Sequence, residues 1–168
     1  MLRKIKLLLI VGISLLMSAV VAEADEPRNW DLVKDLVAVI SVPDDVLNHP
    51  ALANIGHVQS PAELRGFYRD LNSDGAPEIF VESARIQCGQ SGCAYALFDG
   101  RTSSHLGEMG GNLIREATPQ FNGWSVLEWS SHVGASAAAY AVFAYTGSEY
   151  APVSYLQFPA SSMTFPNL

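Results

Sequence analysis

The stretch Asp70–Ala84, which reads D-L-N-S-D-G-A-P-E-I-F-V-E-S-A, marks the point where the patterning of the sequence changes. Its first half is rich in Asp, Asn, Ser and Gly, which favour turns and loops. Its second half, Glu78–Ala84, combines aromatic and β-branched residues in a short run that predicts a strand. We therefore expect a sheet on the C-terminal side of Asp70, where strand-like runs continue, and helices on its N-terminal side.

Beyond this loop, further runs have strand-like composition and are separated by turn signals. D-G at 99–100 and T-G at 146–147 are typical of hairpin turns, and G-G at 110–111 is a further break. Successive strands joined by short turns predict an antiparallel meander. The expected strands are Cys93–Asp99, Trp124–Ser130, Ala137–Tyr145 and Tyr150–Phe158, with weaker ones at Thr102–Met109 and Leu113–Ala117.

Two helices are predicted before the loop. Asn29–Ser41 has apolar residues at helical spacing. The capping box S-P-A-E at 60–63 predicts a short helix from Pro61 to about Tyr68. Pro43–Gln59 between them is expected to be mostly loop, with one helical turn at Asp44–Leu47. The predicted fold is therefore α+β, with N-terminal helices packed on a mainly antiparallel β-meander sheet.

The N-terminus has the pattern of a signal peptide. Met1–Lys6 carries three positive charges, Leu7–Val21 is uncharged and apolar, and A-E-A at 22–24 is a small-residue cleavage pattern. The apolar run is shorter than the roughly 20 residues that a membrane-spanning helix needs, so cleavage is favoured over an uncleaved anchor. We expect cleavage after Ala24, with Ala22 as the alternative, and no membrane span afterwards. The expected location is periplasmic or secreted.

This interpretation divides the chain into three parts: a signal peptide over residues 1–24, a single domain over residues 25–159 and a C-terminal tail over residues 160–168. The whole chain of 168 residues carries 10 Lys and Arg against 17 Asp and Glu. Without residues 1–24, 7 basic and 16 acidic residues remain, which gives a net charge of −9. That charge argues against nucleic acid as a partner and favours a cationic protein partner.

Cys88 and Cys93 are the only cysteines, and they stand in C-G-Q-S-G-C. An oxidising compartment favours a disulfide between them. A zinc site would need further ligands, and the usual redox spacing is C-x-x-C. We therefore predict a structural disulfide.

The loop that follows Asp70 presents hard oxygen ligands at alternate positions, as Ca²⁺ requires. The candidate ligands are Asp70, Asn72, Asp74, the carbonyl of Ala76, and Glu78. An EF-hand would place Glu at loop position 12, where this chain has Val81, so an EF-hand is excluded. Two alternatives stay open: a structural Ca²⁺ site, or a set of Asx-turns that needs no metal.

The segment D-L-N-S-D-G-A-P-E resembles the calcium loops of FG-GAP and VCBS repeats, which read D-x-N-x-D-G-x-x-D before a strand. Here Glu78 replaces the last Asp, and the motif occurs once, so the repeated β-propeller of those proteins is not predicted. The order of D-L-N-x-D-G-x-x-E-I and then C-G-x-x-G-C is similar to small, uncharacterised exported bacterial proteins. That resemblance covers roughly residues 67–152 and implies export but no activity.

Three functions remain open. The first is an exported non-catalytic domain with a binding or inhibitory role, stabilised by calcium. The second is a small periplasmic hydrolase that uses carboxylates, with Glu128 as the candidate acid and Glu82 as its partner if their strands are adjacent. The third is a structural, envelope-associated protein. We favour the first, because the sequence contains no recognisable catalytic constellation, and we assign no catalytic residue.

Overall fold

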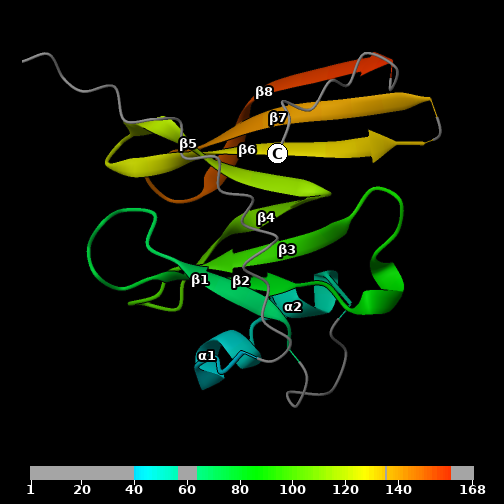
Figure 1. Ribbon diagram of the computed structural model, residues 1–168. Coiled ribbons are helices and arrows are strands. Elements are labelled where there is room, and N and C mark those ends of the chain that lie inside the picture. Colours follow the sequence, from blue (N-terminus) through cyan, green and yellow to red (C-terminus); the bar gives the residue numbers. More distant parts are fainter. Residues whose placement is uncertain (1–39, 57–63, 135, 160–168) are drawn as a thin grey trace, which may run out of the picture.

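The computed structural model describes residues 40–56, 64–134 and 136–159, and these residues form two four-stranded antiparallel sheets (Figure 1). Within each sheet the strands lie side by side in chain order. The first sheet contains β1 (Gly66–Arg69), β2 (Glu78–Glu82), β3 (Cys93–Phe98) and β4 (His105–Gly111). The second contains β5 (Leu113–Phe121), β6 (Trp124–Val133), β7 (Ala137–Tyr145) and β8 (Tyr150–Pro159).

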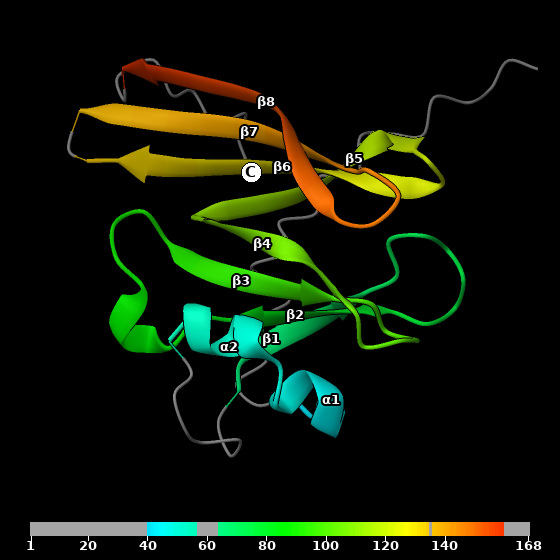
Figure 2. The ribbon, with the colours of Figure 1, turned by 180° about the vertical axis from the view of Figure 1, so that it is seen from behind.

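The chain passes from one sheet to the other at a single residue, Asn112, between β4 and β5. Its backbone N–H donates to the carbonyl of Ser130 at 3.0 Å, and its side-chain oxygen accepts the N–H of His132 at 3.1 Å. Gly111 precedes this corner, and a Cβ there would lie 2.0 Å from Nε1 of Trp129. Glycine is therefore required for the close passage between the sheets, which Figure 2 shows from behind.

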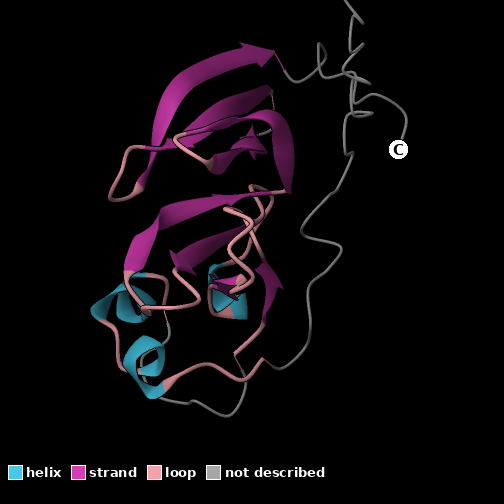
Figure 3. Ribbon diagram, turned by 90° about the vertical axis from the view of Figure 1, so that its left-hand side faces the viewer, coloured by secondary structure: helices cyan, strands magenta, loops and turns pink. Residues whose placement is uncertain are grey.

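Three short helical elements accompany the sheets. Helices α1 (Asp44–Leu47) and α2 (Pro50–Asn54) lie against the first sheet on the side away from the second sheet, as the side view in Figure 3 shows. A 3₁₀ turn, η3 (Arg85–Gln87), follows β2.

Two hydrophobic clusters hold these layers together. The cluster between the sheets is aromatic-rich, and its buried members are Phe67, Leu71, Phe80, Tyr95, Leu97, Leu106, Met109, Ile114, Leu127 and Tyr150. The cluster between the first sheet and the helices consists of Ile40, Val46, Ala51, Leu52, Ile55, Leu64, Ile79, Val81, Ala96 and Phe98. Successive side chains of β2 and β3 belong alternately to the two clusters, because neighbouring residues of a strand point to opposite faces of the sheet. The first sheet is therefore buried on both faces.

The predicted α+β fold is wrong. The described chain is β-rich and has no long helix, and two sheets stacked on each other replace the single meander covered by helices. The helix predicted from Pro61 to Tyr68 ends in what is strand β1, where Phe67 pairs with Phe80. Over residues 66–68 the strand prevails because pairing with β2 buries Phe67 between the sheets. The capping residues 60–63 lie outside the described residues. The helix predicted at Asn29–Ser41 lies, except for its last two residues, outside the described residues.

The strand predictions are largely confirmed. Strand β7 has the predicted bounds, and β2, β3, β6 and β8 match the prediction to within a few residues at each end. The weaker predictions correspond to β4 and β5, and the predicted turn at Asp44–Leu47 is α1. Helix α2 lies in a segment that the sequence predicted as loop.

Within the part of the chain that the structure describes, no helix is both long and apolar enough to cross a membrane. The predicted signal peptide (1–24) and tail (160–168) lie outside the described residues.

Candidate functional site

The loop Asp70–Pro77 joins β1 to β2 and is closed by the side chain of Asp70. The two carboxylate oxygens of Asp70 accept the backbone N–H groups of Asp74 at 3.2 Å and of Gly75 at 3.0 Å. Gly75 has a φ of 82°, which a residue with a side chain rarely adopts, so glycine allows this turn. The first predicted ligand thus organises the loop around its own carboxylate.

The next two predicted ligands also bind the loop backbone. Asn72 Oδ1 accepts the N–H of Asp74 at 2.9 Å, and Asp74 Oδ1 accepts the N–H of Ala76 at 2.8 Å. The hydrogen bond from Ala76 and the nearby guanidinium of Arg101 hold the pKa of Asp74 below its usual value. Asp74 therefore stays ionised at the exposed tip of the loop.

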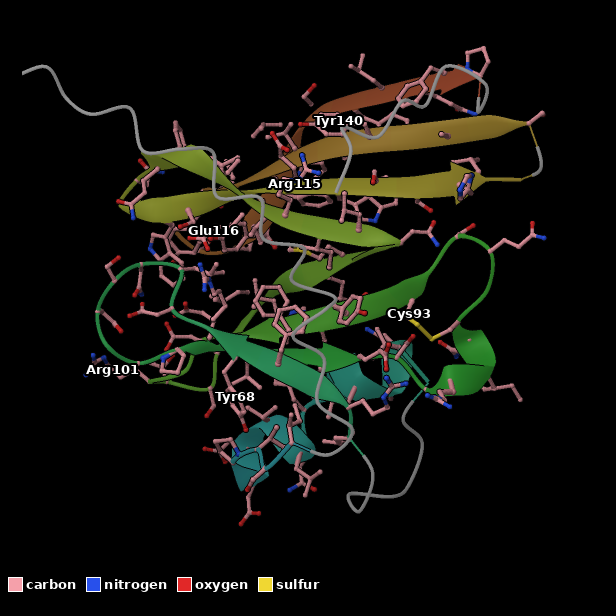
Figure 4. The ribbon with its side chains drawn as sticks, in the orientation of Figure 1. Tyr68, Cys93, Arg101, Arg115, Glu116 and Tyr140 are labelled. Carbon is pink, nitrogen blue, oxygen red and sulfur yellow. A yellow bond between two sulfur atoms is a disulfide. The ribbon has the colours of Figure 1, made fainter. Side chains whose placement is uncertain are left out.

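Arg101, from the turn between β3 and β4, places a positive charge on this loop (Figure 4). Its Nε and Nη2 each lie 3.2 Å from Oδ2 of Asp74, and Nη2 also donates to the Asp74 carbonyl at 3.1 Å. The Arg101 side chain is 61% exposed, so the pair contributes little to stability. Its consequence is electrostatic, because a cation already neutralises part of the loop's charge.

Glu78 lies at the start of β2 and is only 1% exposed. Its Oε2 accepts the N–H of Leu71 at 2.6 Å, whereas its Oε1 is buried without a hydrogen-bond partner. Burial, with smaller contributions from the charges of Asp70 and Asp99, raises the pKa of Glu78 to about 7. This carboxyl group is therefore poised to gain or lose a proton, or to accept a cation, near neutral pH.

The structure brings the predicted ligands onto one loop but does not gather their charged oxygens at one point. Asp70, Asn72 and Asp74 bond to the loop backbone, and Glu78 is turned towards the core between the sheets. The carbonyl of Ala76 faces the β3–β4 turn, where a Cβ on Gly100 would lie 3.0 Å from it. A search of the described residues for three acidic, His or Cys side chains with ligand atoms within 4.8 Å of one another finds Glu82, Cys88 and Cys93, and not the loop residues.

A set of polar side chains lies beneath the loop, between the two sheets, and we call it the inter-sheet polar cluster: Arg69, Glu78, Glu116, Ser125 and Tyr150. Arg69 Nε donates to Glu116 Oε2 at 2.6 Å, and its Nη2 forms an ion pair with the same oxygen. Ser125 Oγ donates to Glu116 Oε1 at 2.7 Å. The Tyr150 hydroxyl donates to the Ser125 carbonyl at 2.8 Å.

This cluster also connects the loop to the second sheet. The N–H of Ser125 donates to the carbonyl of Leu71 at 2.7 Å, and Leu71 is the residue whose own N–H is bonded to Glu78. Burial and the neighbouring Glu78 and Glu116 raise the pKa of Tyr150, so its hydroxyl stays protonated. Hydrogen bonds therefore connect the loop to β6 through Ser125 and to the start of β8 through Tyr150.

The predicted disulfide is confirmed: Cys88 and Cys93 are bonded. Figure 4 shows Cys93 at the opposite end of the first sheet from Arg101. The loop that it closes is held to the second sheet, because Ser131 Oγ donates to the Ser91 carbonyl at 2.8 Å. The nearby Glu82 is buried, and it bonds with Tyr95 and forms an ion pair with Arg65 at 3.2 Å.

The carboxylates that the hydrolase hypothesis considered lie in different sheets. Glu82 is on β2, and Glu128 is on β6, opposite Arg115 of β5. Glu128 lies on the face of the second sheet away from Leu127, which is buried against the first sheet. Burial and a hydrogen bond with Glu128 raise the pKa of Tyr140 to about 12. Glu82 and Glu128 therefore do not form a pair.

Sequence reasoning missed two groups of side chains. The inter-sheet polar cluster joins residues far apart in the chain, and Glu116 gave no signal because it lies on a weakly predicted strand. His49 and His105 also stack, with ring centroids 5.3 Å apart, and both pack against Phe98. Burial and the nearby His49 lower the pKa of His105. Only the pairing of β3 with β4 and the position of α2 reveal this contact.

Searches of protein-family models, of curated proteins and of solved structures each find no match to this chain.

Proposed function

We propose that this chain is an exported, non-catalytic binding domain whose β1–β2 loop is stabilised by a structural Ca²⁺ ion. The observation that carries the proposal is the carboxyl group of Glu78. It is buried, has one oxygen without a hydrogen-bond partner, and adjoins a loop that already contains Asp70 and Asp74. A buried carboxylate oxygen without a hydrogen-bond partner is costly, and a cation bound to it would remove that cost.

The chemistry of the loop fits Ca²⁺. Carboxylate, amide and carbonyl oxygens are the ligands that this hard cation takes, and weak extracellular sites are occupied at millimolar concentrations. The charged oxygens of Asp70, Asp74 and Glu78 do not meet at one point in the structure, so binding requires the loop to rearrange. After that change Asp70, Asn72, Asp74 and the Ala76 carbonyl would hold the ion together with Glu78. The ion would supply charge neutralisation at the junction of loop and strand, and no catalytic step is assigned to it.

The two other buried glutamates, Glu82 and Glu116, support a non-catalytic role. Glu116 is held by Arg69 and Ser125, and Glu82 by Arg65 and Tyr95. Such groups maintain the fold, whereas a catalytic acid must touch its substrate. Export is supported by the basic and apolar N-terminal pattern and by the Cys88–Cys93 disulfide, which is typical of oxidising compartments.

The calcium part of the proposal is tested by thermal unfolding of the disulfide-bonded protein with Ca²⁺ and with a chelator. For a Kd of about 1 mM, 10 mM Ca²⁺ stabilises the folded state by about 1.4 kcal/mol, which corresponds to a rise in Tm of about 3 °C or more. Equal ionic strength of Mg²⁺ should give a smaller rise, because Mg²⁺ demands a stricter octahedral geometry.

Asp74→Ala is the matched variant, since it removes a charged ligand at the exposed tip of the loop. It should abolish the difference between Ca²⁺ and chelator. Asp45→Ala, on exposed α1, is the control and should keep that difference. A rise in Tm below 1 °C for the unmodified protein in 10 mM Ca²⁺ would reject a calcium site in the folded state.

A further inference from the structure

The largest exposed apolar side chains of the second sheet gather on its last strand. Val153, Tyr155 and Leu156 of β8 are 61%, 57% and 58% exposed. Strand β8 pairs with β7 alone, so its other edge carries backbone groups that no strand of the described sheets covers. A long apolar edge of this kind is a site for pairing with another strand.

The other sheet ends each have a feature that blocks such pairing. At β1, the segment at Ile40 lies alongside, and its N–H donates to the Leu64 carbonyl at 2.8 Å. At β4, Gly107 lies against the backbone of Tyr150 from the second sheet. Strand β5 carries Arg115 and has an irregular register near its end. Charges, covering segments and bulges are the usual protections of an edge strand.

Strand β8 has one of these features, an irregular register at Val153, which has no partner residue on β7. The rest of the strand is uncharged, and no strand of the described sheets covers its outer edge. Pro152 and Pro159 lack the N–H that a ladder needs, so they limit pairing to the segment between them. That segment, Val153–Phe158, reads V-S-Y-L-Q-F and contains no charged residue. Six residues are a typical length for a strand in a sheet.

The charge of this region favours a second copy of the chain as the occupant. The whole chain carries −7, but β6, β7 and β8 contain one residue charged at pH 7, Glu128, which lies two strands from the free edge. Two copies can therefore meet at β8 without facing carboxylates. A cationic partner strand would gain no ion pair with β8, because β8 contains no acidic residue.

We propose that β8 pairs antiparallel with β8 of a second copy, so that the two second sheets become one continuous sheet across a two-fold axis. An axis perpendicular to the sheet places each residue on the same face in both copies, and it passes close to Tyr155 and Leu156. Tyr155 lies opposite Ala141 and Leu156 opposite Tyr140 on β7, so pairing covers apolar side chains on both faces.

This inference rests on the binding role proposed above, for which it names a partner, but it does not depend on calcium. The loop Asp70–Pro77 joins two strands of the first sheet, whereas β8 is an edge strand of the second sheet. The two features can therefore be measured separately on the same samples.

Sedimentation velocity of the disulfide-bonded protein between 5 and 200 µM tests the dimer. The unmodified protein should sediment as a dimer at the upper concentrations. Leu156→Lys places two positive charges near the two-fold axis and should weaken the dimer at least tenfold. Phe121→Lys, at a residue 52% exposed on β5 of the same sheet, is the matched control and should leave the dimer intact.

A monomer at 200 µM, or a dimer that survives Leu156→Lys, would overturn the inference. Equal loss of the dimer in Phe121→Lys would also overturn it, because the effect would not be specific to β8. Circular dichroism and Tm verify that each variant is folded, and Tyr155→Lys replaces Leu156→Lys if that variant unfolds. The response of Tm to Ca²⁺, read on the same samples, distinguishes failure of the dimer from failure of the calcium site.

Discussion

The side-chain Oε2 of Glu78 accepts the backbone N–H of Leu71 at 2.6 Å, which ties the start of β2 to the start of the loop before it. Leu71 in turn accepts the N–H of Ser125 through its carbonyl, so this one residue connects the loop, the first sheet and the second sheet. The protonation state of Glu78 therefore bears on the junction of both sheets.

Replacement of Glu78 by Gln should change how stability depends on pH. Because the folded-state pKa of Glu78 is raised to about 7, its contribution is fully present below about pH 4.5 and is lost as pH rises through 7. In chelator, Glu78→Gln should match the unmodified protein near pH 5 and be more stable at pH 8. Urea unfolding at both values measures the difference.

Glu149→Gln, on the exposed turn before β8, is the control for that experiment and should keep the pH dependence of the unmodified protein. If Glu78→Gln shows the same loss of stability between pH 5 and pH 8 as the unmodified protein, another group is responsible.

Loss of one partner of the Arg69–Glu116 pair should destabilise the domain markedly. Glu116 is 9% exposed, so Arg69→Met leaves a buried carboxylate without its main cation, at a cost of about 3–5 kcal/mol. The double variant Arg69→Met/Glu116→Leu should recover part of this loss, because no buried charge remains. A double-mutant cycle in urea measures the coupling, and additive effects would contradict it.

Removal of the disulfide should lower stability modestly and leave the fold intact. The closed loop between Cys88 and Cys93 is short, so the chain-entropy model gives about 2 kcal/mol. Cys88→Ser/Cys93→Ser should unfold at lower urea with an unchanged m-value. A reducing agent should shift the unmodified protein to the same midpoint and leave the double variant unaffected.

Arg101→Gln should strengthen calcium binding. The guanidinium of Arg101 lies on Asp74, the residue whose carboxylate would bind the ion, so the two cations compete for one group. Its removal should tighten the Kd for Ca²⁺ by about 2–5-fold at low ionic strength. Arg85→Gln, on exposed η3, is the control and should not change the Kd. Weaker binding in Arg101→Gln would show that Arg101 organises the loop instead.

The sequence was informative where structure follows from neighbouring residues. Strand β7 was predicted with its observed bounds because Ala137–Tyr145 is apolar, aromatic at intervals and followed by a turn signal. The disulfide followed from two cysteines and two glycines in one short segment. In both cases the interaction that decides the outcome is local.

The division into two sheets could not be predicted, because nothing in the sequence around Asn112 distinguishes a change of sheet from a hairpin turn. The burial of Glu78 and Glu116 was missed for the same reason, since only the stacking of the two sheets encloses them. The packing of Trp124 was not predicted either: its ring stacks on Tyr145 with centroids 4.2 Å apart and packs against the core between the sheets.

The most direct test of the central claim is a titration of the ¹⁵N-labelled protein with Ca²⁺, followed through its backbone amide resonances. The N–H groups of Leu71 and Gly75 are bonded to the carboxylates of Glu78 and Asp70. If those carboxylates bind Ca²⁺, both resonances should shift together and saturate with a Kd of about 1 mM or tighter, and Asp74→Ala should abolish the shift. Unchanged Leu71 and Gly75 resonances at 10 mM Ca²⁺ would contradict the claim.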